Sequence, residues 1–154
     1  MEPGQRIPAF ELPDQDGKRR TVEDLAGPKG LVLYVYPKDD TPGCTIEAQD
    51  FRDLLPELRR LGYEVAGISR DPADSHCRFI DKFGLTFPLL TDADAGLLEA
   101  VGAYGEKQMY GKTVRGIIRS TVVVDPEGRV IRAYPNVEAQ GHAARVLADL
   151  VGAA

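Results

Sequence analysis

Two apolar segments separated by a helical pattern constrain the fold of this chain most strongly. Leu31–Tyr36 (LVLYVY) is nearly all apolar and β-prone, which predicts a strand buried on both faces. Tyr63–Ser69 (YEVAGIS) predicts a second central strand. Between them, apolar residues recur at helical spacing until a closing glycine: Phe51, Leu54, Leu55, Leu58, Leu61 and then Gly62. This order predicts parallel strands joined by a right-handed helical crossover.

The N-terminal segment predicts a β-hairpin. Phe10–Pro13 and Arg19–Val22 flank Asp14–Gly17, whose Asp-Gly pair favours a tight turn. Thr21 is a suitable N-cap for a short helix over Val22–Leu25.

The rest of the chain alternates between helices and strands. The predicted elements are a helix from Asp74 to Phe83 capped by Asp74 or Ser75, a strand over Phe87–Leu90, a helix over Ala95–Val101, strands over Thr121–Asp125 and Arg129–Tyr134, and a helix over Glu138–Val151. Its internal proline places the Phe87–Leu90 strand near a sheet edge or at a strand start. Pro56 is expected to kink or split the helix that contains it. The fold class is therefore α/β, with a mixed sheet covered by helices on both faces.

Composition is that of an ordinary globular protein, and 154 residues suit a single domain spanning 1–154. The formal net charge of −5 argues against nucleic acid or an anionic membrane as partner. No run approaches the ~18 apolar residues of a membrane span. The N-terminus lacks a secretory signal, so we expect a cytoplasmic protein, in which structural disulfides are rare. Its two cysteines are then more plausibly reactive or buried than a staple.

Cys44 stands where the first crossover helix begins, after the turn in Pro37-Lys38-Asp39-Asp40-Thr41-Pro42-Gly43. The positive end of the helix macrodipole and the unpaired N–H groups of a first turn favour thiolate over thiol. Because the thiolate is the nucleophile, this cysteine predicts an enzyme with one activated sulfur.

The motif PKDDTPGC resembles the active-site signature of the peroxiredoxins. YPKDDTPGCTIEAQDFRD (residues 36–53) and GKTVRGIIRSTVVVDPEGRV (residues 111–130) resemble the bacterioferritin comigratory protein subfamily, also called peroxiredoxin Q. FELPDQDG and FPLLTD also fit, and the likeness runs from about residue 3 to 151. The resemblance implies a thioredoxin-like fold with an N-terminal hairpin extension, and a peroxidase acting on hydrogen peroxide and organic hydroperoxides without metal or organic cofactor.

The resemblance also implies a role for each matching residue. Cys44 is the peroxidatic cysteine, Thr41 offers its hydroxyl to the sulfur and the peroxide, Pro37 shields the pocket, and Arg119 supplies positive charge. Gly43 and Cys44 contribute backbone N–H groups.

Alternatives remain open for several of these residues. Glu47 either orients Arg119 or is a capping or surface residue. Arg119 itself could be a surface residue at a strand start, Thr41 could also act as an N-cap, and Cys44 could be structural.

A lowered thiol pKa alone does not explain fast peroxide reduction. A free cysteine is about 3% thiolate at neutral pH, so lowering its pKa to about 6 gains roughly 30-fold. Nucleophilicity falls by about 10-fold over the same change, leaving a net gain of only about 3-fold. Most acceleration must come from groups that align the peroxide and stabilise charge on the breaking O–O bond, which suits Thr41, Arg119 and the two N–H groups.

The second cysteine departs from the commonest subfamily pattern. Many members carry it five residues after the first, where this chain has Gln49. Some members place the resolving cysteine in a later helix, and Cys77 resembles theirs. The resemblance then implies a Cys44 sulfenic acid that condenses with Cys77 and is reopened by a thioredoxin-type reductant.

Resolution by Cys77 requires movement. A disulfide needs Cα atoms about 4.4–6.8 Å apart, which two helix-borne cysteines are not expected to satisfy in the reduced fold. The first turn of the Cys44 helix must then unwind, and Pro56 is expected to confine that unwinding. Alternatively, Cys77 is a small buried hydrophobe beside Phe79, Ile80 and Phe83, and the enzyme is a one-cysteine peroxidase.

Other signals favour no competing function strongly. His76 adjoins Cys77 but lacks two further metal ligands at usable spacing, and His142 is expected at the surface. Gly111-Lys112-Thr113 is not a phosphate-binding loop, because Gly105 lies one residue too far back. A rival from another class is a redox sensor or thiol-dependent chaperone module. Peroxide and a thiol reductant are the expected partners, with a monomer favoured over a dimer.

Overall fold

The computed structural model describes residues 1–153, and all but two of its elements were expected from the sequence. They are β1 (Leu12–Pro13), β2 (Arg19–Arg20), α1 (Val22–Leu25), β3 (Gly30–Val35), α2 (Pro42–Arg60), β4 (Tyr63–Ser69), α3 (Ala73–Phe83), β5 (Leu89–Thr91), α4 (Gly96–Ala100), β6 (Tyr104–Met109), β7 (Lys112–Ile117), β8 (Ser120–Val124), β9 (Val130–Tyr134) and α5 (His142–Gly152).

A five-stranded mixed sheet organises the molecule, in the order β5-β4-β3-β8-β9. β3 and β4 are parallel, as are β4 and β5, whereas β8 runs antiparallel to both β3 and β9. This is a thioredoxin-like arrangement, which confirms the predicted fold class. β5 lies at one edge and starts directly after Pro88, as the proline required.

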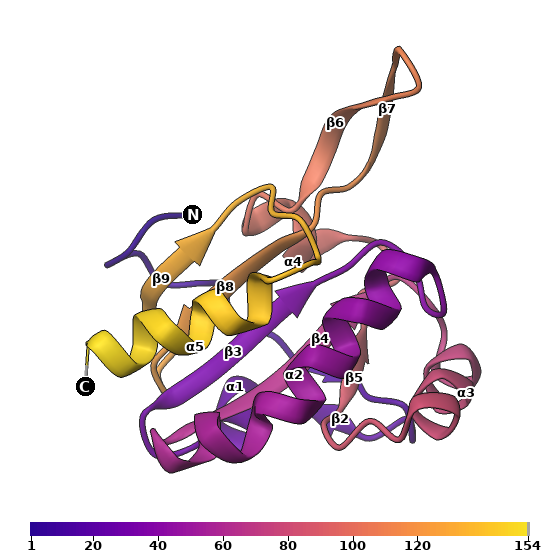
Figure 1. Cartoon of the computed structure of the whole chain (residues 1–154). Coiled ribbons are helices and arrows are strands. Elements are labelled where there is room, and N and C mark those ends of the chain that lie inside the picture. Colours follow the sequence, from indigo (N-terminus) through magenta and orange to yellow (C-terminus); the bar gives the residue numbers. More distant parts are fainter. Residues whose placement is uncertain (154) are drawn as a thin grey trace.

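Every residue of the central strand β3 is buried, so both faces of the sheet are covered. Val32 and Tyr34 face a core shared with α2, α3 and α5, whereas Leu31 and Leu33 face a second core shared with α1 and α4. In Figure 1, α2 and α5 lie side by side over the first of these faces. The expectation of helices on both faces is therefore confirmed.

The helix α2 is one continuous helix, so the expected split at Pro56 is wrong. Pro56 lies on the exposed side, where water can hydrogen-bond the carbonyl that loses its partner. Buried residues on both sides of the proline, among them Phe51, Leu55 and Leu58, anchor the two halves to the same core. Packing outweighs the missing hydrogen bond.

Helix starts are where the sequence pattern was least accurate. Thr21 caps α1 in a reciprocal capping box with Asp24, as expected. Neither Asp74 nor Ser75 caps α3, which begins at Ala73 after Pro72. The helix α5 begins at His142, four residues after the predicted start at Glu138, because Gly141 adopts a left-handed conformation with φ of 78°.

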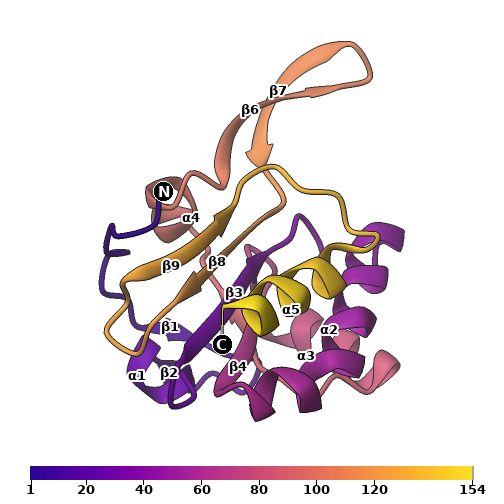
Figure 2. The ribbon, with the colours of Figure 1, turned by 60° about the vertical axis from the view of Figure 1, so that its left-hand side comes forward.

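An unpredicted β-hairpin, formed by β6 and β7, projects from the body in Figures 1 and 2. Its strands pair from Tyr104 with Ile117 to Met109 with Lys112, leaving a two-residue turn at Tyr110 and Gly111. Both turn residues have positive φ (54° and 77°), which is the geometry of a type I′ turn. Tyr-Gly lacks the Asn or Asp that normally marks this turn, so the signal was weak.

Candidate active site

Cys44 lies in the first turn of α2 and is 1% exposed. The first i to i−4 hydrogen bond of this helix runs from the Thr45 N–H to the Thr41 carbonyl, at 2.8 Å. The N–H groups of Gly43 and Cys44 therefore precede the helical ladder and have no acceptor within it. The sulfur lies where the macrodipole and these two donors favour negative charge.

Arg119 reaches the sulfur from the loop between β7 and β8. Its Nη2 donates to the Cys44 Sγ at 3.3 Å. A Cβ placed on Gly43 would lie 3.1 Å from this same Nη2, so the absence of a side chain there admits the guanidinium. The backbone of Arg119 is fixed by a hydrogen bond from Val137 N–H to its carbonyl. With only 15% of its side chain exposed, Arg119 is not the surface residue that the alternative required.

Glu47, one turn further along α2, holds the other side of the guanidinium. Arg119 Nη1 donates to the Glu47 Oε1 at 2.6 Å, and the Glu47 side chain is fully buried. Burial raises the pKa of this carboxyl to about 7, although the charge and hydrogen bond of Arg119 act in the opposite direction. Its Oε2 has no hydrogen-bond partner. Glu47 is therefore not a capping or surface residue, and its protonation is balanced near neutral pH.

Thr41 and Pro37 flank the turn that leads into α2. Thr41 occupies the N-cap position, but its hydroxyl makes no capping bond and donates to the Lys38 carbonyl at 2.9 Å. In this state the hydroxyl can accept a hydrogen bond but cannot donate one to the sulfur. Pro37 is half-buried and forms part of a cavity wall.

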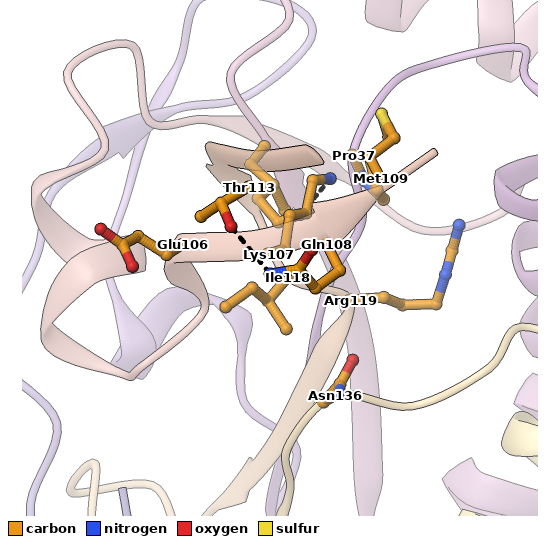
Figure 3. Close-up of a pocket in the computed structure, with 10 residues that line it drawn as sticks. Pro37, Glu106, Lys107, Gln108, Met109, Thr113, Ile118, Arg119 and Asn136 are labelled. Carbon is orange, nitrogen blue, oxygen red and sulfur yellow. Dashed lines mark hydrogen bonds between the residues drawn. The ribbon is translucent and has the colours of Figure 1, made fainter. Parts of the chain in front are cut away.

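That cavity, of about 700 Å³, lies between the β6–β7 hairpin and the body of the protein. Figure 3 shows Pro37 and Arg119 on its wall together with hairpin residues such as Lys107 and Met109. The Lys107 Nζ is held by the Ile117 carbonyl at 2.8 Å. Cys44 does not line the cavity, and Arg119 is the lining residue that also contacts its sulfur.

Cys77 is half-buried on α3, in very different surroundings. Its Sγ donates to the Gln15 carbonyl, in the loop between β1 and β2, at 3.0 Å. Desolvation, followed by the charges of Asp16 and Asp81, raises the pKa of this thiol. Both cysteines are free thiols. The structure therefore brings Arg119 and Glu47 to Cys44 but leaves the Cys77 thiol bonded to the N-terminal hairpin.

His142 is buried, with 4% exposure, so the prediction of a surface histidine is wrong. It begins α5 and its Nε2 lies 2.8 Å from the Thr121 hydroxyl oxygen. The ring packs edge-on against Phe51 and Tyr134. Burial, with smaller contributions from nearby arginines, lowers its pKa to about 4, so the imidazole is neutral at neutral pH.

A second buried group was missed, although each of its residues stands near a motif. Asp39 belongs to the turn before Cys44 and His76 precedes Cys77, and the two side chains meet at 2.7 Å. From the sequence, His76 was considered only as a metal ligand. The pairing of His76 with Asp39, 37 positions away, has no local sequence signal.

Comparison with known proteins places this geometry in a family. A family model described as the AhpC/TSA family matches residues 3–133. The chain belongs to this family. The Mycobacterium tuberculosis protein Rv2521, which is named as a peroxiredoxin, is 51% identical over 150 residues, covering 97% of this chain and 95% of that protein.

Solved structures agree with this assignment. The bacterioferritin comigratory protein of Xanthomonas campestris, described in connection with its alkyl peroxide reduction activity, matches with a TM-score of 0.86 and 43% identity, covering 99% of this chain and 96% of the other. A Cys-to-Ser variant of Xylella fastidiosa PrxQ matches with a TM-score of 0.90 and 38% identity, with coverage of 99% and 96%. The chain is thus a peroxiredoxin of the Bcp/PrxQ type, and so a peroxidase.

None of the helices within residues 1–153 of this peroxiredoxin is long and apolar enough to cross a membrane.

Proposed function

We propose that this peroxiredoxin reduces hydrogen peroxide and organic hydroperoxides through Cys44, with Cys77 as the resolving cysteine and a thioredoxin-type dithiol as the reductant. The observation that carries the proposal is the contact between the Arg119 guanidinium and the Cys44 sulfur, 3.3 Å from Nη2 to Sγ, at the start of a helix. A guanidinium and two free N–H groups around one sulfur form an anion-stabilising site.

In the first step the Cys44 thiolate attacks the nearer peroxide oxygen. An S–O bond forms while the O–O bond breaks, and the leaving alkoxide or hydroxide takes a proton to become an alcohol or water. Sulfur is oxidised to the sulfenic acid and the peroxide is reduced. Arg119 and the free N–H groups stabilise the charge that moves from sulfur to the departing oxygen, with Glu47 orienting the guanidinium.

The Thr41 hydroxyl has a defined part in this step. Its hydrogen is directed to the Lys38 carbonyl, so its lone pairs are free to accept a hydrogen bond from the incoming hydroperoxide. Pro37 and Arg119 both line the cavity beneath the β6–β7 hairpin, which offers room for the organic substituent of a hydroperoxide.

In the second step the Cys77 sulfur attacks the sulfenic sulfur of Cys44. The S–S bond forms, the S–O bond breaks, and the hydroxyl leaves as water. A dithiol reductant then exchanges with this disulfide and regenerates two thiols. Because Cys44 and Cys77 lie on separate helices and contact different partners, the first turn of α2 and the start of α3 must unwind for the sulfurs to meet.

A one-cysteine cycle with an external thiol is the second candidate. The observation that favours it is the state of Cys77, whose thiol is bonded to Gln15 and whose pKa is raised. A raised pKa lowers the thiolate fraction and slows attack on the sulfenic acid.

Intact mass after one equivalent of hydrogen peroxide, without added thiol, separates these two cycles. We expect the reduced protein to lose two hydrogens within the monomer, as a Cys44–Cys77 disulfide requires. A gain of one oxygen without loss of hydrogens contradicts resolution by Cys77 and favours the external thiol.

Two matched variants complete this test. The Cys77→Ser variant is expected to consume one equivalent of peroxide and then stall with oxygen on Cys44. Cys44→Ser is expected to consume none. Repeated turnover of the wild type with a thioredoxin system excludes a sensor that oxidises once.

A further inference from the structure

A cluster of four polar side chains joins the turn before Cys44 to the start of α3. We call it the Asp39 cluster, and it consists of Tyr36, Asp39, Ser75 and His76. The Asp39 carboxylate receives the Tyr36 hydroxyl at 2.5 Å and the Ser75 hydroxyl at 2.8 Å, and its Oδ2 lies 2.7 Å from the His76 Nδ1. The Asp39 side chain is 3% exposed and that of His76 is fully buried.

The hydrogen inventory of this cluster is complete. The His76 Nε2 faces the Leu90 carbonyl at 3.0 Å and must carry a hydrogen, because a carbonyl only accepts. The His76 Nδ1 and the Asp39 Oδ2, 2.7 Å apart, are within hydrogen-bond distance, so both ring nitrogens of His76 have a partner. Burial raises the pKa of Tyr36 well above its usual value, so its hydroxyl stays a donor. Such satisfied buried networks hold their members in one arrangement.

The backbone of the turn is fixed by a second carboxylate. The Asp39 N–H donates to the Asp71 Oδ2 at 2.9 Å, and Asp71 also receives the Ser69 hydroxyl at 2.7 Å. Asp71 lies in the short connection between β4 and α3. The backbone of Asp39 therefore binds the segment that precedes α3, and its side chain binds Ser75 and His76 in the first turn of α3 itself.

The position of His76 limits the movement of Cys77. Consecutive Cα atoms are about 3.8 Å apart, so Cys77 cannot travel far while the preceding residue is held in the cluster. The rest of α3 is attached at its other end, by the exposed pair of Lys82 with Asp40 and by Arg52 donating to the Phe83 carbonyl. Of these attachments only the Asp39 cluster adjoins Cys77 in sequence, and its Asp39 and His76 side chains are buried.

We propose that the Asp39 cluster is a latch, in which Asp39 and His76 are positioning residues that order the two steps of the cycle. Closed, it holds the turn carrying Pro37 and Thr41 in the form that receives peroxide, and it holds Cys77 away from Cys44. Opening frees both segments together and permits disulfide formation. The timing role rests on the proposed function of Cys77, whereas the coupling of the two segments does not.

The test compares the two chemical steps in variants that weaken the latch. Asp39→Asn and the milder Ser75→Ala are mixed with peroxide and quenched at increasing times, and the masses are read as thiol, sulfenic acid or disulfide. We expect disulfide closure to accelerate by about 10-fold in Asp39→Asn and by less in Ser75→Ala, since hydrogen bonds to a charged group are lost. Peroxide attack on Cys44 is expected to slow, because the turn loses its anchor.

Two controls separate a latch from a general loss of stability. Arg78→Ala removes an exposed ion pair with Asp74 on the same helix, with side chains 72% and 74% exposed, and is expected to change neither rate. Val146→Ala weakens the core at α5 and removes none of the hydrogen bonds of the Asp39 cluster. Equal acceleration of closure in Val146→Ala, or unchanged closure in both cluster variants, overturns the latch.

Amide hydrogen exchange in a Cys77→Ser background keeps the two proposals distinguishable. Asp39→Asn in this background is expected to speed exchange in residues 37–44 and 73–83 together. Acceleration in only one of the two segments, or in neither, overturns the coupling. If the wild type forms no disulfide at all, resolution by Cys77 fails and the timing role with it, while the exchange result still decides the coupling.

Discussion

The two cysteines of this chain occupy opposite chemical environments, Cys44 in the first turn of α2 and Cys77 in the second turn of α3. Cys44 is buried, and the Arg119 guanidinium donates to its sulfur. Cys77 is half-buried, donates its hydrogen to a carbonyl, and is surrounded by aspartates such as Asp16 and Asp81. The same thiol therefore faces positive charge at one site and negative charge at the other.

This difference teaches that the partners brought to a sulfur by the rest of the fold, together with its place in a helix, decide the charge that it faces. What separates the two sites is the long-range partner: Arg119 comes from a loop 75 residues away from Cys44, whereas Cys77 has no guanidinium bonded to its sulfur among the described residues. These charges favour Cys44 over Cys77 as the sulfur that carries the proposed first oxidation.

Removing the Arg119 guanidinium should have the largest effect on the difference in reactivity between the two cysteines. We predict that Arg119→Met slows oxidation of Cys44 by about 100-fold, because a fixed donor to the transition-state charge is lost. The rate at which an alkylating reagent modifies Cys44 is expected to fall by much less, because alkylation has no breaking O–O bond to stabilise. Stopped-flow oxidation and alkylation at one pH measure the two rates, and equal losses in both contradict a transition-state role.

The arginine variant needs a control for the carboxyl it leaves unpaired. Arg119→Met combined with Glu47→Gln removes the buried acid, and the slow oxidation is expected to persist. Arg115→Met, at an exposed arginine with 59% side-chain exposure, is expected to leave the rate unchanged.

The buried Glu47 carboxyl beside Arg119 should make the free energy of unfolding of the protein depend on pH. The pKa of Glu47 is about 7 in the folded protein and 4.5 in its ordinary state, so the folded protein holds its proton over this interval. Its contribution is present below pH 4.5 and is lost as pH rises through about 7, for a total on the order of 3 kcal/mol. Urea unfolding across this range should show the slope in the wild type and its loss in Glu47→Gln.

A matched acid on the same helix tests whether burial is the cause. Glu57→Gln alters an exposed glutamate paired with Arg60, and its stability profile should follow that of the wild type. A profile of Glu47→Gln that also follows the wild type contradicts the raised pKa.

Neutralising an aspartate near Cys77 should have the smallest effect on the difference between the two cysteines. We predict that Asp16→Asn and Asp81→Asn each lower the pKa of Cys77 and speed its alkylation a few-fold, since exposed charges are screened. Alkylation rates against pH in a Cys44→Ser background measure this, with the exposed Glu23→Gln as control. Unchanged rates in both aspartate variants assign the raised pKa to desolvation alone.

Much of the fold was predictable because its determinants are local. The apolar strands β3 and β4, the capping box at Thr21 and the β8–β9 turn each carry their signal within a few residues. The weak points were backbone conformations without a marker residue, such as the Tyr110-Gly111 turn, and the outcome at Pro56, which tertiary packing decided.

In the candidate site, too, the residues that belong to a local motif were predictable and the contacts between distant segments were not. Cys44, Thr41 and Arg119 were nominated by motif, and the structure brings Cys44 and Arg119 into contact. The pairing of Asp39 with His76 and the burial of His142 depend on segments far apart in the sequence, which no local pattern reports. A single domain over residues 1–154, a monomer and a cytoplasmic location stay predictions.

The β6–β7 hairpin offers a place to attach a reporter to this enzyme. Tyr110 is 97% exposed at its tip, and the two-residue turn reverses the chain outside both apolar cores. A segment spliced between Tyr110 and Gly111 lengthens a surface loop, and each doubling of loop length costs only about 0.6 kcal/mol. Since the chain contains no tryptophan, a single indole in such an insert would be the sole tryptophan emission of the molecule. A fluorescent label can thus be installed at a site remote from both sulfurs in the sequence.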